Sequence, residues 1–247
     1  MTIYERENMF WQAMKDHLPE EARNHVCIDG LCPCRAQGYY TKDEDFLLSP
    51  YPKVVFISKD MNDNPGEDIR DWPMYDIPEK NFSVSAFYLN MLKILWALNT
   101  VTCEYLPSFN ANRADYIERA MRYPLVNINL KKESGGSSVS MRDVCKCVNR
   151  DLPFLKEQIR LLYDPTVIVC LGGDGYVRIK DVIINRMYDD LYFVKYNDWC
   201  YYSKEKNLLV IDAYHPRARV SDNQKYDELI INVQDYLHQT NRYSLSE

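Results

Sequence analysis

Thr166-Val-Ile-Val-Cys-Leu-Gly172 is a short, continuously apolar run that is rich in β-branched residues and ends at a glycine. Such continuous hydrophobicity is typical of strands buried on both faces of a parallel sheet, because a strand with one solvated face alternates apolar and polar residues. Three more runs share this character, at 53–58, 123–130 and 207–213. We therefore expect four buried parallel strands.

Segments with helical periodicity separate these runs. One helix is predicted from an apolar stripe made of Tyr88, Met91, Leu92, Leu95 and Trp96. A second helix is expected to start at Asp151 as its N-cap, with Pro153 in the first turn, and to end at Asp164. Ser221 and Gln224 form a predicted capping box for a C-terminal helix.

The alternation of strands and helices predicts an α/β fold, a three-layer α/β/α sandwich with a central four-stranded parallel sheet. The whole chain, 1–247, is expected to form one domain with a Cys-containing N-terminal extension over about 1–50. A small hairpin is expected within 191–203, ahead of the last strand.

The composition is that of an ordinary globular protein, with 46% apolar residues among 247. No apolar run approaches the roughly 18 residues of a membrane span, and the N-terminus lacks a secretory pattern, so we expect a cytoplasmic protein without a membrane partner. The net charge of 30 − 36 = −6 means that any DNA binding depends on a local basic patch. No protein partner can be inferred.

Polar residues stand where the predicted strands end. Asp60 follows the first strand, Asn127 lies in the second, Gly172-Gly-Asp-Gly175 ends the third and His215 follows the fourth. Because the carboxyl ends of parallel strands share one rim of the sheet, Asp60, Asn127 and His215 should converge. Each also has a purely structural interpretation: Asp60 as a turn or cap residue, Asn127 as a partner for backbone groups, and His215 as a loop residue. The glycines at 172–175 either cradle a phosphate or let the strand turn into a helix, and the segment 134–138 is either a phosphate-binding loop or a flexible tip.

In order and spacing, this series resembles the uracil-DNA glycosylase superfamily over roughly 50–240. The segment that ends in Asp60-Met-Asn62 resembles the family's first strand and its Gly-Gln-Asp-Pro-Tyr motif, and Phe82-Ser-Val84 matches the family's Phe-Ser-Val. Leu125-Val-Asn127-Ile resembles Leu-Leu-Asn-Ala, and Tyr214-His215-Pro216 resembles the Tyr-His-Pro-Ser of the iron–sulfur branch. The resemblance implies a DNA glycosylase, an enzyme that hydrolyses the N-glycosidic bond of a nucleotide flipped out of the stack.

The resemblance also implies roles for these residues. Asp60 would stabilise the oxocarbenium-like sugar and activate the attacking water, and a neutral His215 would donate a hydrogen bond to base O2. Phe82 would stack on the base, and Asn127 would pair with its Watson–Crick edge. An amide presents donor and acceptor in either order, so Asn127 alone suits uracil or cytosine. No cofactor is required for this chemistry.

The sequence departs from the family at the positions that select the base. Asn62 replaces the tyrosine that blocks substituents at C5 in uracil-specific members, and Ser58 replaces the first glycine of the motif. Arg217 and Arg219 stand where the family has Ser and often an apolar wedge. These changes favour a pyrimidine bulkier than uracil, such as a thymine-like lesion or a modified cytosine. Glucosylated hydroxymethylcytosine of phage DNA is one candidate, which would make the protein an anti-phage enzyme.

Several cysteines form a candidate metal site near the predicted first strand. Cys27-x4-Cys32-Pro-Cys34 lies where iron–sulfur glycosylases carry their first pair, and Cys145-x-Cys147 could replace their later ligands, at whose positions this chain has Lys131-Lys132 and Asp151. Thiolates in such a set suit a structural [4Fe–4S] cluster or Zn. The spacing differs from that of the family, so free buried thiols remain the alternative.

DNA is the expected partner of the enzyme. The residues predicted to contact it are Lys131, Lys132, Ser137, Ser138, Arg217 and Arg219, with Arg150 and Lys225 nearby. Two other hypotheses remain: a non-catalytic module of the same fold that binds a nucleotide or DNA, and a different α/β enzyme that binds nucleotide phosphate through the glycines after Leu171.

Overall fold

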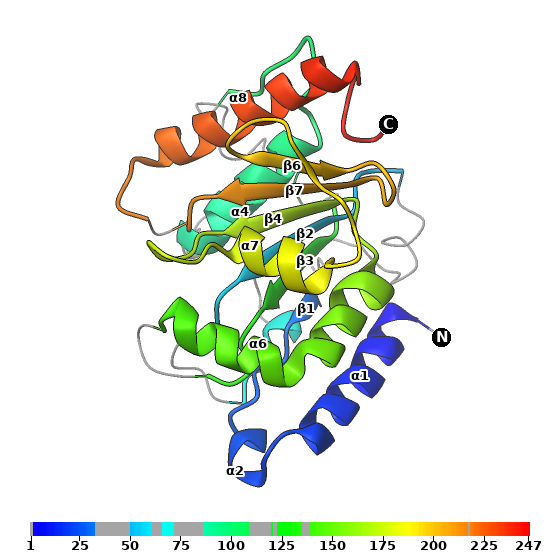
Figure 1. Ribbon diagram of the computed structural model, residues 1–247, viewed down its shortest axis with the longest axis vertical. Helices are drawn as coiled ribbons and strands as arrows, with labels where there is room; N and C mark the ends of the chain where they lie inside the picture. The colour runs from blue at the N-terminus through cyan, green and yellow to red at the C-terminus, as the bar shows by residue number, and fades with distance from the viewer. Residues whose placement is uncertain are drawn as a thin grey trace, which may run out of the picture.

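A seven-stranded mixed sheet forms the centre of the protein (Figure 1). The structure is a computed structural model that describes residues 2–32, 50–60, 66–71, 86–108, 120, 123–134, 139–216 and 218–247. The strand order is β1-β3-β2-β4-β7-β6-β5. The α/β class predicted from the sequence is confirmed, and the sheet is larger than predicted.

The four predicted strands form the parallel core of this sheet. They are β2 (Val54–Ser58), β3 (Leu125–Asn129), β4 (Val167–Leu171) and β7 (Leu208–Ala213). β2 lies between β3 and β4, and β4 pairs with β7, all in parallel. The predicted bounds are therefore confirmed to within two residues at each end.

Antiparallel strands extend both edges, so the prediction of a sheet with only four strands is wrong. The three residues of β1 (Gly30–Cys32) pair with β3, which makes part of the N-terminal extension an element of the sheet. β6 (Cys200–Ser203) pairs with β7 and with β5 (Val194–Lys195). The hairpin expected within 191–203 is confirmed.

Helices cover both faces of the sheet, which gives the three layers predicted. On one face, α4 (Ala86–Leu98) and α8 (Asp222–Thr240) pack on strand residues such as Phe56, Leu125 and Val169. On the other, the alternate residues, such as Val55, Val126 and Ile168, contact a second set of elements. These are α1 (Ile3–His17), α6 (Met141–Lys156), η2 (Glu157–Tyr163, a π-helix), α7 (Ile179–Val182) and η3 (Ile183–Met187). Two short elements, α2 (Glu20–Arg23) and η1 (Ile69–Asp71), complete the described structure.

The helix predicted to have Asp151 as its N-cap begins eleven residues earlier, with Ser140 at that position. Ser140 is the N-cap of α6, and its hydroxyl accepts a hydrogen bond from the Asp143 backbone N–H. Pro153 lies inside the helix, near the point where α6 passes into η2, and Asp151 is fully buried and paired with Arg150. The predicted end is confirmed, because Asp164 adopts a left-handed conformation with φ of 45°. Ser221 caps α8 as predicted, but the reciprocal half of the predicted capping box is not formed, because the Gln224 side chain donates to Glu228.

A buried ionic network fixes the N-terminal segment to the sheet. Asp29 and Lys132 both have fully buried side chains, and the Lys132 ammonium lies 2.9 Å from each oxygen of Asp29. Gln158 joins both groups, and the backbone N–H of Asn129, at the end of β3, donates to Asp29 at 2.8 Å. The network therefore sets the position of the chain where β3 ends. Among the helices of the described ranges, none has the length and apolarity needed to cross a membrane.

Candidate functional site

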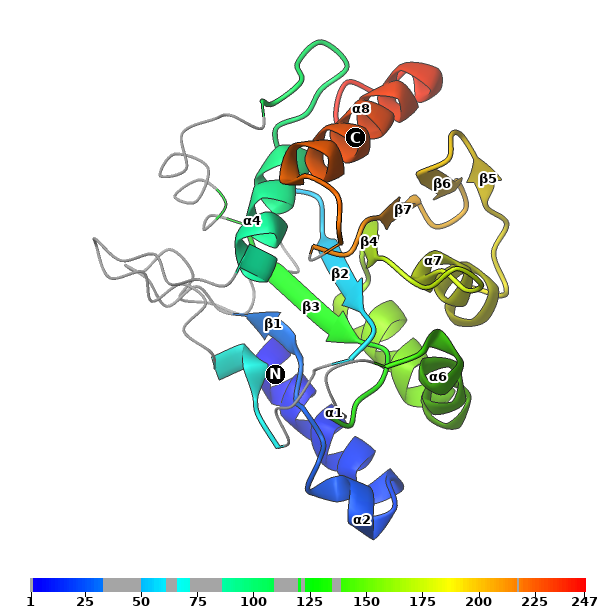
Figure 2. The same ribbon diagram turned by 90° about the vertical axis from the view of Figure 1, so that its left-hand side faces the viewer.

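The carboxyl ends of β2, β3, β4 and β7 lie along one rim of the sheet, which faces the viewer in Figure 2. β4 separates β2 from β7. With a spacing of about 4.8 Å between neighbouring strands, the ends of β2 and β7 are roughly 10 Å apart. This separation suits two side chains that reach toward one planar ring. Asp60 and His215 extend from these two ends.

Asn127 lies in the middle of β3, two residues before the strand ends at this rim. Its side chain alternates with Val126 and Ile128 and therefore points to the sheet face covered by α4. The residue is 1% exposed, and its Oδ1 accepts a hydrogen bond from the Ser58 hydroxyl at 3.3 Å. Ser58 thereby orients the amide and holds the ends of β2 and β3 together. The sequence identified Ser58 only as a departure from the family pattern.

His215 lies in the turn that follows β7, against the glycine at the end of β4. A side chain at Gly172, whose φ is +93°, would place its Cβ 3.1 Å from His215 Cβ, so a glycine is needed for this close approach. The Phe87 ring, from the first turn of α4, packs against the imidazole with 5.6 Å between centroids and 44° between planes. Phe87 thus brings an aromatic ring to the rim. Its proximity depends on how α4 crosses the sheet, which no local motif indicates.

Asp60 follows β2 by two residues and is half-buried. Interstrand bonding continues beyond β2: the Leu130 N–H donates to Ser58 O, and the Lys131 N–H donates to Lys59 O at 2.8 Å. The backbone is therefore held up to the residue before Asp60. Asp60, Asn127 and His215 accordingly share the rim that the sequence predicts for them.

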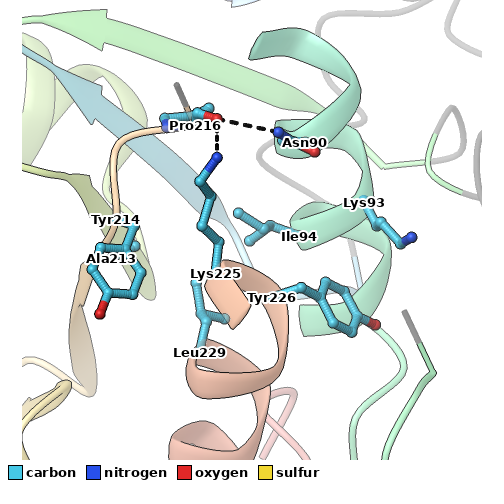
Figure 3. A pocket seen from close by; sticks show the side chains of 9 residues that line it. All are labelled: Asn90, Lys93, Ile94, Ala213, Tyr214, Pro216, Lys225, Tyr226 and Leu229. Carbon is cyan, nitrogen blue, oxygen red and sulfur yellow. Dashed lines mark hydrogen bonds between the residues drawn. The ribbon is translucent and has the colours of Figure 1, made fainter. Parts of the chain in front are cut away.

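Two helices hold the turn that carries His215 through one carbonyl oxygen. The Pro216 carbonyl accepts hydrogen bonds from Asn90 Nδ2 of α4 at 3.3 Å and from Lys225 Nζ of α8 at 2.9 Å (Figure 3). These residues line a recess with an apolar wall that includes Ile94 and Leu229. Lys225 is only 9% exposed, so its ammonium acts within the fold and not as part of a surface patch. Sequence reasoning counted Lys225 among the basic residues near DNA and missed this role.

The glycine-rich segment after β4 forms a tight turn. Asp174 Oδ1 accepts the backbone N–H groups of Tyr176 and Val177 at 2.9 Å each, and Oδ2 accepts that of Met141. The Val177 and Tyr176 donors lower the pKa of the Asp174 carboxyl, so this turn carries a negative charge at neutral pH. A carboxylate that occupies the backbone donors leaves them unavailable to a phosphate. The geometry favours the turn interpretation of Gly172–Gly175 over the phosphate cradle.

The structure corrects part of the predicted basic patch. Lys132 is 1% exposed and bound to Asp29 and Gln158, so it cannot reach a phosphate. Burial lowers its pKa, an effect that the Asp29 charge opposes. Arg150 is held by the carboxylates of Glu133 and Asp151.

Two of the predicted DNA contacts remain near the surface. Lys131 is half-buried and donates to the Glu133 carbonyl, and Arg219 is exposed. Six other predicted site residues lie outside the described ranges: Asn62, Phe82, Ser137, Ser138, Arg217 and the metal-site candidate Cys34.

The remaining cysteines of the predicted metal site are separate thiols in the described structure. Cys27 and Cys32 are buried, and Cys145 and Cys147 lie half-buried on α6. Burial raises the pKa of Cys27, Cys32 and Cys147. Within the described ranges, which exclude Cys34, no three His, Cys, Asp or Glu side chains are grouped as metal ligands. The cysteine set stays a prediction.

No protein-family model matches this chain, and no curated protein matches it. The geometry of the rim is therefore the basis on which a function can be argued.

Proposed function

We propose that the protein is a DNA glycosylase that hydrolyses the N-glycosidic bond of a flipped-out pyrimidine larger than uracil, leaving an abasic site. One observation carries this proposal: a carboxylate and an imidazole follow the ends of two strands in the parallel core of the sheet, and a buried amide lies inside a third strand, on the face covered by α4. Together these groups supply what the reaction needs, namely a base for water, a reader of the nucleobase edge and a donor to the departing base.

In the proposed reaction, water attacks C1′ of the deoxyribose as the bond from C1′ to the base nitrogen breaks. The electron pair of that bond moves onto the base, where the charge spreads to O2. Asp60 accepts the proton of the attacking water and stabilises the cationic sugar, and neutral His215 donates a hydrogen bond to O2. The base anion then takes a proton from solvent and Asp60 releases its proton to solvent, so the products are the free base and an abasic sugar.

Recognition of the base is assigned to Asn127 and an aromatic ring. Asn127 Oδ1 has two lone pairs, so it can accept from Ser58 and from the base at the same time. Phe87, which already contacts His215, is positioned to pack against a base near the imidazole. Phe82 remains the aromatic that the family resemblance proposes.

The expected substrate is a modified pyrimidine, such as a modified cytosine of phage DNA, because Asn62 replaces the residue that excludes C5 substituents in the uracil-specific enzymes that the sequence resembles. The protein would contact the DNA backbone through Lys131 and Arg219, together with Ser137, Ser138 and Arg217. Affinity should then fall steeply with salt concentration.

The experiment that tests the proposal is alkali-induced strand cleavage after incubation with DNAs carrying uracil, thymine, 5-hydroxymethylcytosine or its glucosylated form. We expect abasic sites at a bulky pyrimidine, and His215→Ala should lower the single-turnover rate by about 10²–10³-fold. Abasic sites on none of these DNAs, single- or double-stranded, would contradict the proposal. DNA binding that persists without excision would instead support a non-catalytic module of this fold.

A separate prediction follows from the hydrogen bonds to the Pro216 carbonyl. Lys225→Met removes the donor at 2.9 Å and lets the His215 turn shift, so we expect an excision rate constant lowered by about tenfold with little change in DNA affinity. Lys225→Arg, which keeps a donor, should recover most of the rate. An equal effect of Met and Arg, or a loss of affinity without a loss of rate, would show that Lys225 acts in another way.

A further inference from the structure

Asn129 is a second buried amide close to the rim. It is the last residue of β3 and pairs in register with Ser58 of β2. Because side chains alternate along a strand, Asn129 points to the same sheet face as Asn127, two residues nearer the rim. The two Cα atoms are therefore roughly 6.6 Å apart along the strand.

The Asn129 side chain is not explained by folding alone. The residue is 2% exposed, and its Nδ2 has no hydrogen-bond partner among the residues that the structure describes. The backbone of Asn129 is held separately, because its N–H donates to Asp29. A buried amide without a partner lowers stability, and natural proteins contain few such groups. A ligand that brings an acceptor to this position would satisfy it.

We propose that Asn129 Nδ2 donates a hydrogen bond to an oxygen on the C5 substituent of the bound pyrimidine. This inference rests on the proposed function and narrows its substrate class to pyrimidines whose substituent carries an acceptor, such as a hydroxymethyl group. Asn127 reads the ring edge, and Asn129, farther along β3, reaches an atom beyond that edge. A methyl group cannot accept this hydrogen bond, so the site should prefer the hydroxymethyl base.

The stability of a variant tests the unpartnered amide without any substrate. Asn129→Leu keeps the branching of the side chain and removes the buried polar atoms, so its urea midpoint should equal or exceed that of the wild type. Gln158→Met is the matched control. Its amide is also buried, but both of its polar atoms are bonded, to Lys132 and Asp29, so this variant should unfold at lower urea. A clear loss of stability, or failure to fold, in Asn129→Leu would overturn the inference.

A second experiment compares excision from two duplexes that are identical except for one base, which is 5-hydroxymethylcytosine in one and 5-methylcytosine in the other. The wild type should excise the hydroxymethyl base faster, and Asn129→Leu should reduce this preference by about 5- to 150-fold, mainly through the hydroxymethyl substrate. A preference that Asn129→Leu leaves unchanged overturns the inference while the proposed function stands.

A third readout does not require catalysis. In a ¹⁵N-labelled protein, the Asn129 side-chain amide resonance should shift when the hydroxymethyl duplex is added and shift less with the methyl duplex. If the protein excises no base but these shifts occur, the glycosylase proposal fails and recognition by Asn129 stands. Equal shifts with both duplexes, or none, overturn the inference.

Discussion

Asp60→Asn is expected to lower the rate constant of base excision, measured in a single turnover, by about 10²–10⁴-fold. Asparagine keeps the shape of the side chain but cannot accept the proton of the attacking water and carries no charge to stabilise the sugar cation. DNA affinity should be unchanged or tighter, because a negative charge is removed near the phosphates. The two quantities are measured by alkali-induced cleavage and by fluorescence anisotropy with the same labelled duplex.

Asp198→Asn is the control for the change in net charge. Asp198 is exposed and pairs with Lys195 in the hairpin of β5 and β6. This hairpin is not part of the proposed site. It should excise at the wild-type rate. An Asp60→Asn protein that excises within a few-fold of the wild type would exclude Asp60 as the group that activates water.

Lys132→Met is expected to lower the free energy of unfolding by about 3–5 kcal/mol. The change leaves the Asp29 carboxylate buried without its cation, although Asn129 N–H and Gln158 still donate to it. Urea unfolding followed by far-UV circular dichroism measures the loss. Adding Asp29→Asn to Lys132→Met should recover part of the stability, because the uncompensated buried charge is then removed.

The control for this prediction is an exposed ion pair of similar length. The ammonium of Lys195 lies 2.7 Å from Asp198 Oδ1, with both side chains exposed to solvent, so Lys195→Met should unfold at nearly the wild-type urea concentration. A Lys132→Met protein as stable as the wild type would mean that the buried pair of Lys132 and Asp29 does not stabilise the fold where β3 ends.

The parallel core was predictable because its strands are buried on both faces, and this makes their sequences continuously apolar. β1 was not predictable in the same way, because three residues that include Gly30 carry no periodicity. The start of α6 was missed because Pro153 resembles a first-turn proline, whereas the Ser140 cap, thirteen residues earlier, sets the real start. Local patterns thus located the strands but placed the start of this helix wrongly.

The positions of Asp60, Asn127 and His215 at one rim followed from the topology rule for parallel sheets. Their neighbours did not, because contacts between distant segments leave no local signal: Phe87 reaches His215 from α4, and Asn90 of the same helix donates to the Pro216 carbonyl. Lys132 shows the opposite error. A lysine next to a glycine- and serine-rich loop suggests a surface cation, yet its partner Asp29 lies 103 residues away and draws it inside.

The central claim is that these residues line one site that receives a nucleobase, and a crystal structure of the Asp60→Asn protein with a duplex containing 5-hydroxymethylcytosine tests it most directly. We expect the base to be extruded, with its Watson–Crick edge about 2.7–3.2 Å from the Asn127 amide, O2 equally close to His215, and C1′ facing residue 60. A base that stays stacked, or binds away from Asn127 and His215, would contradict the account.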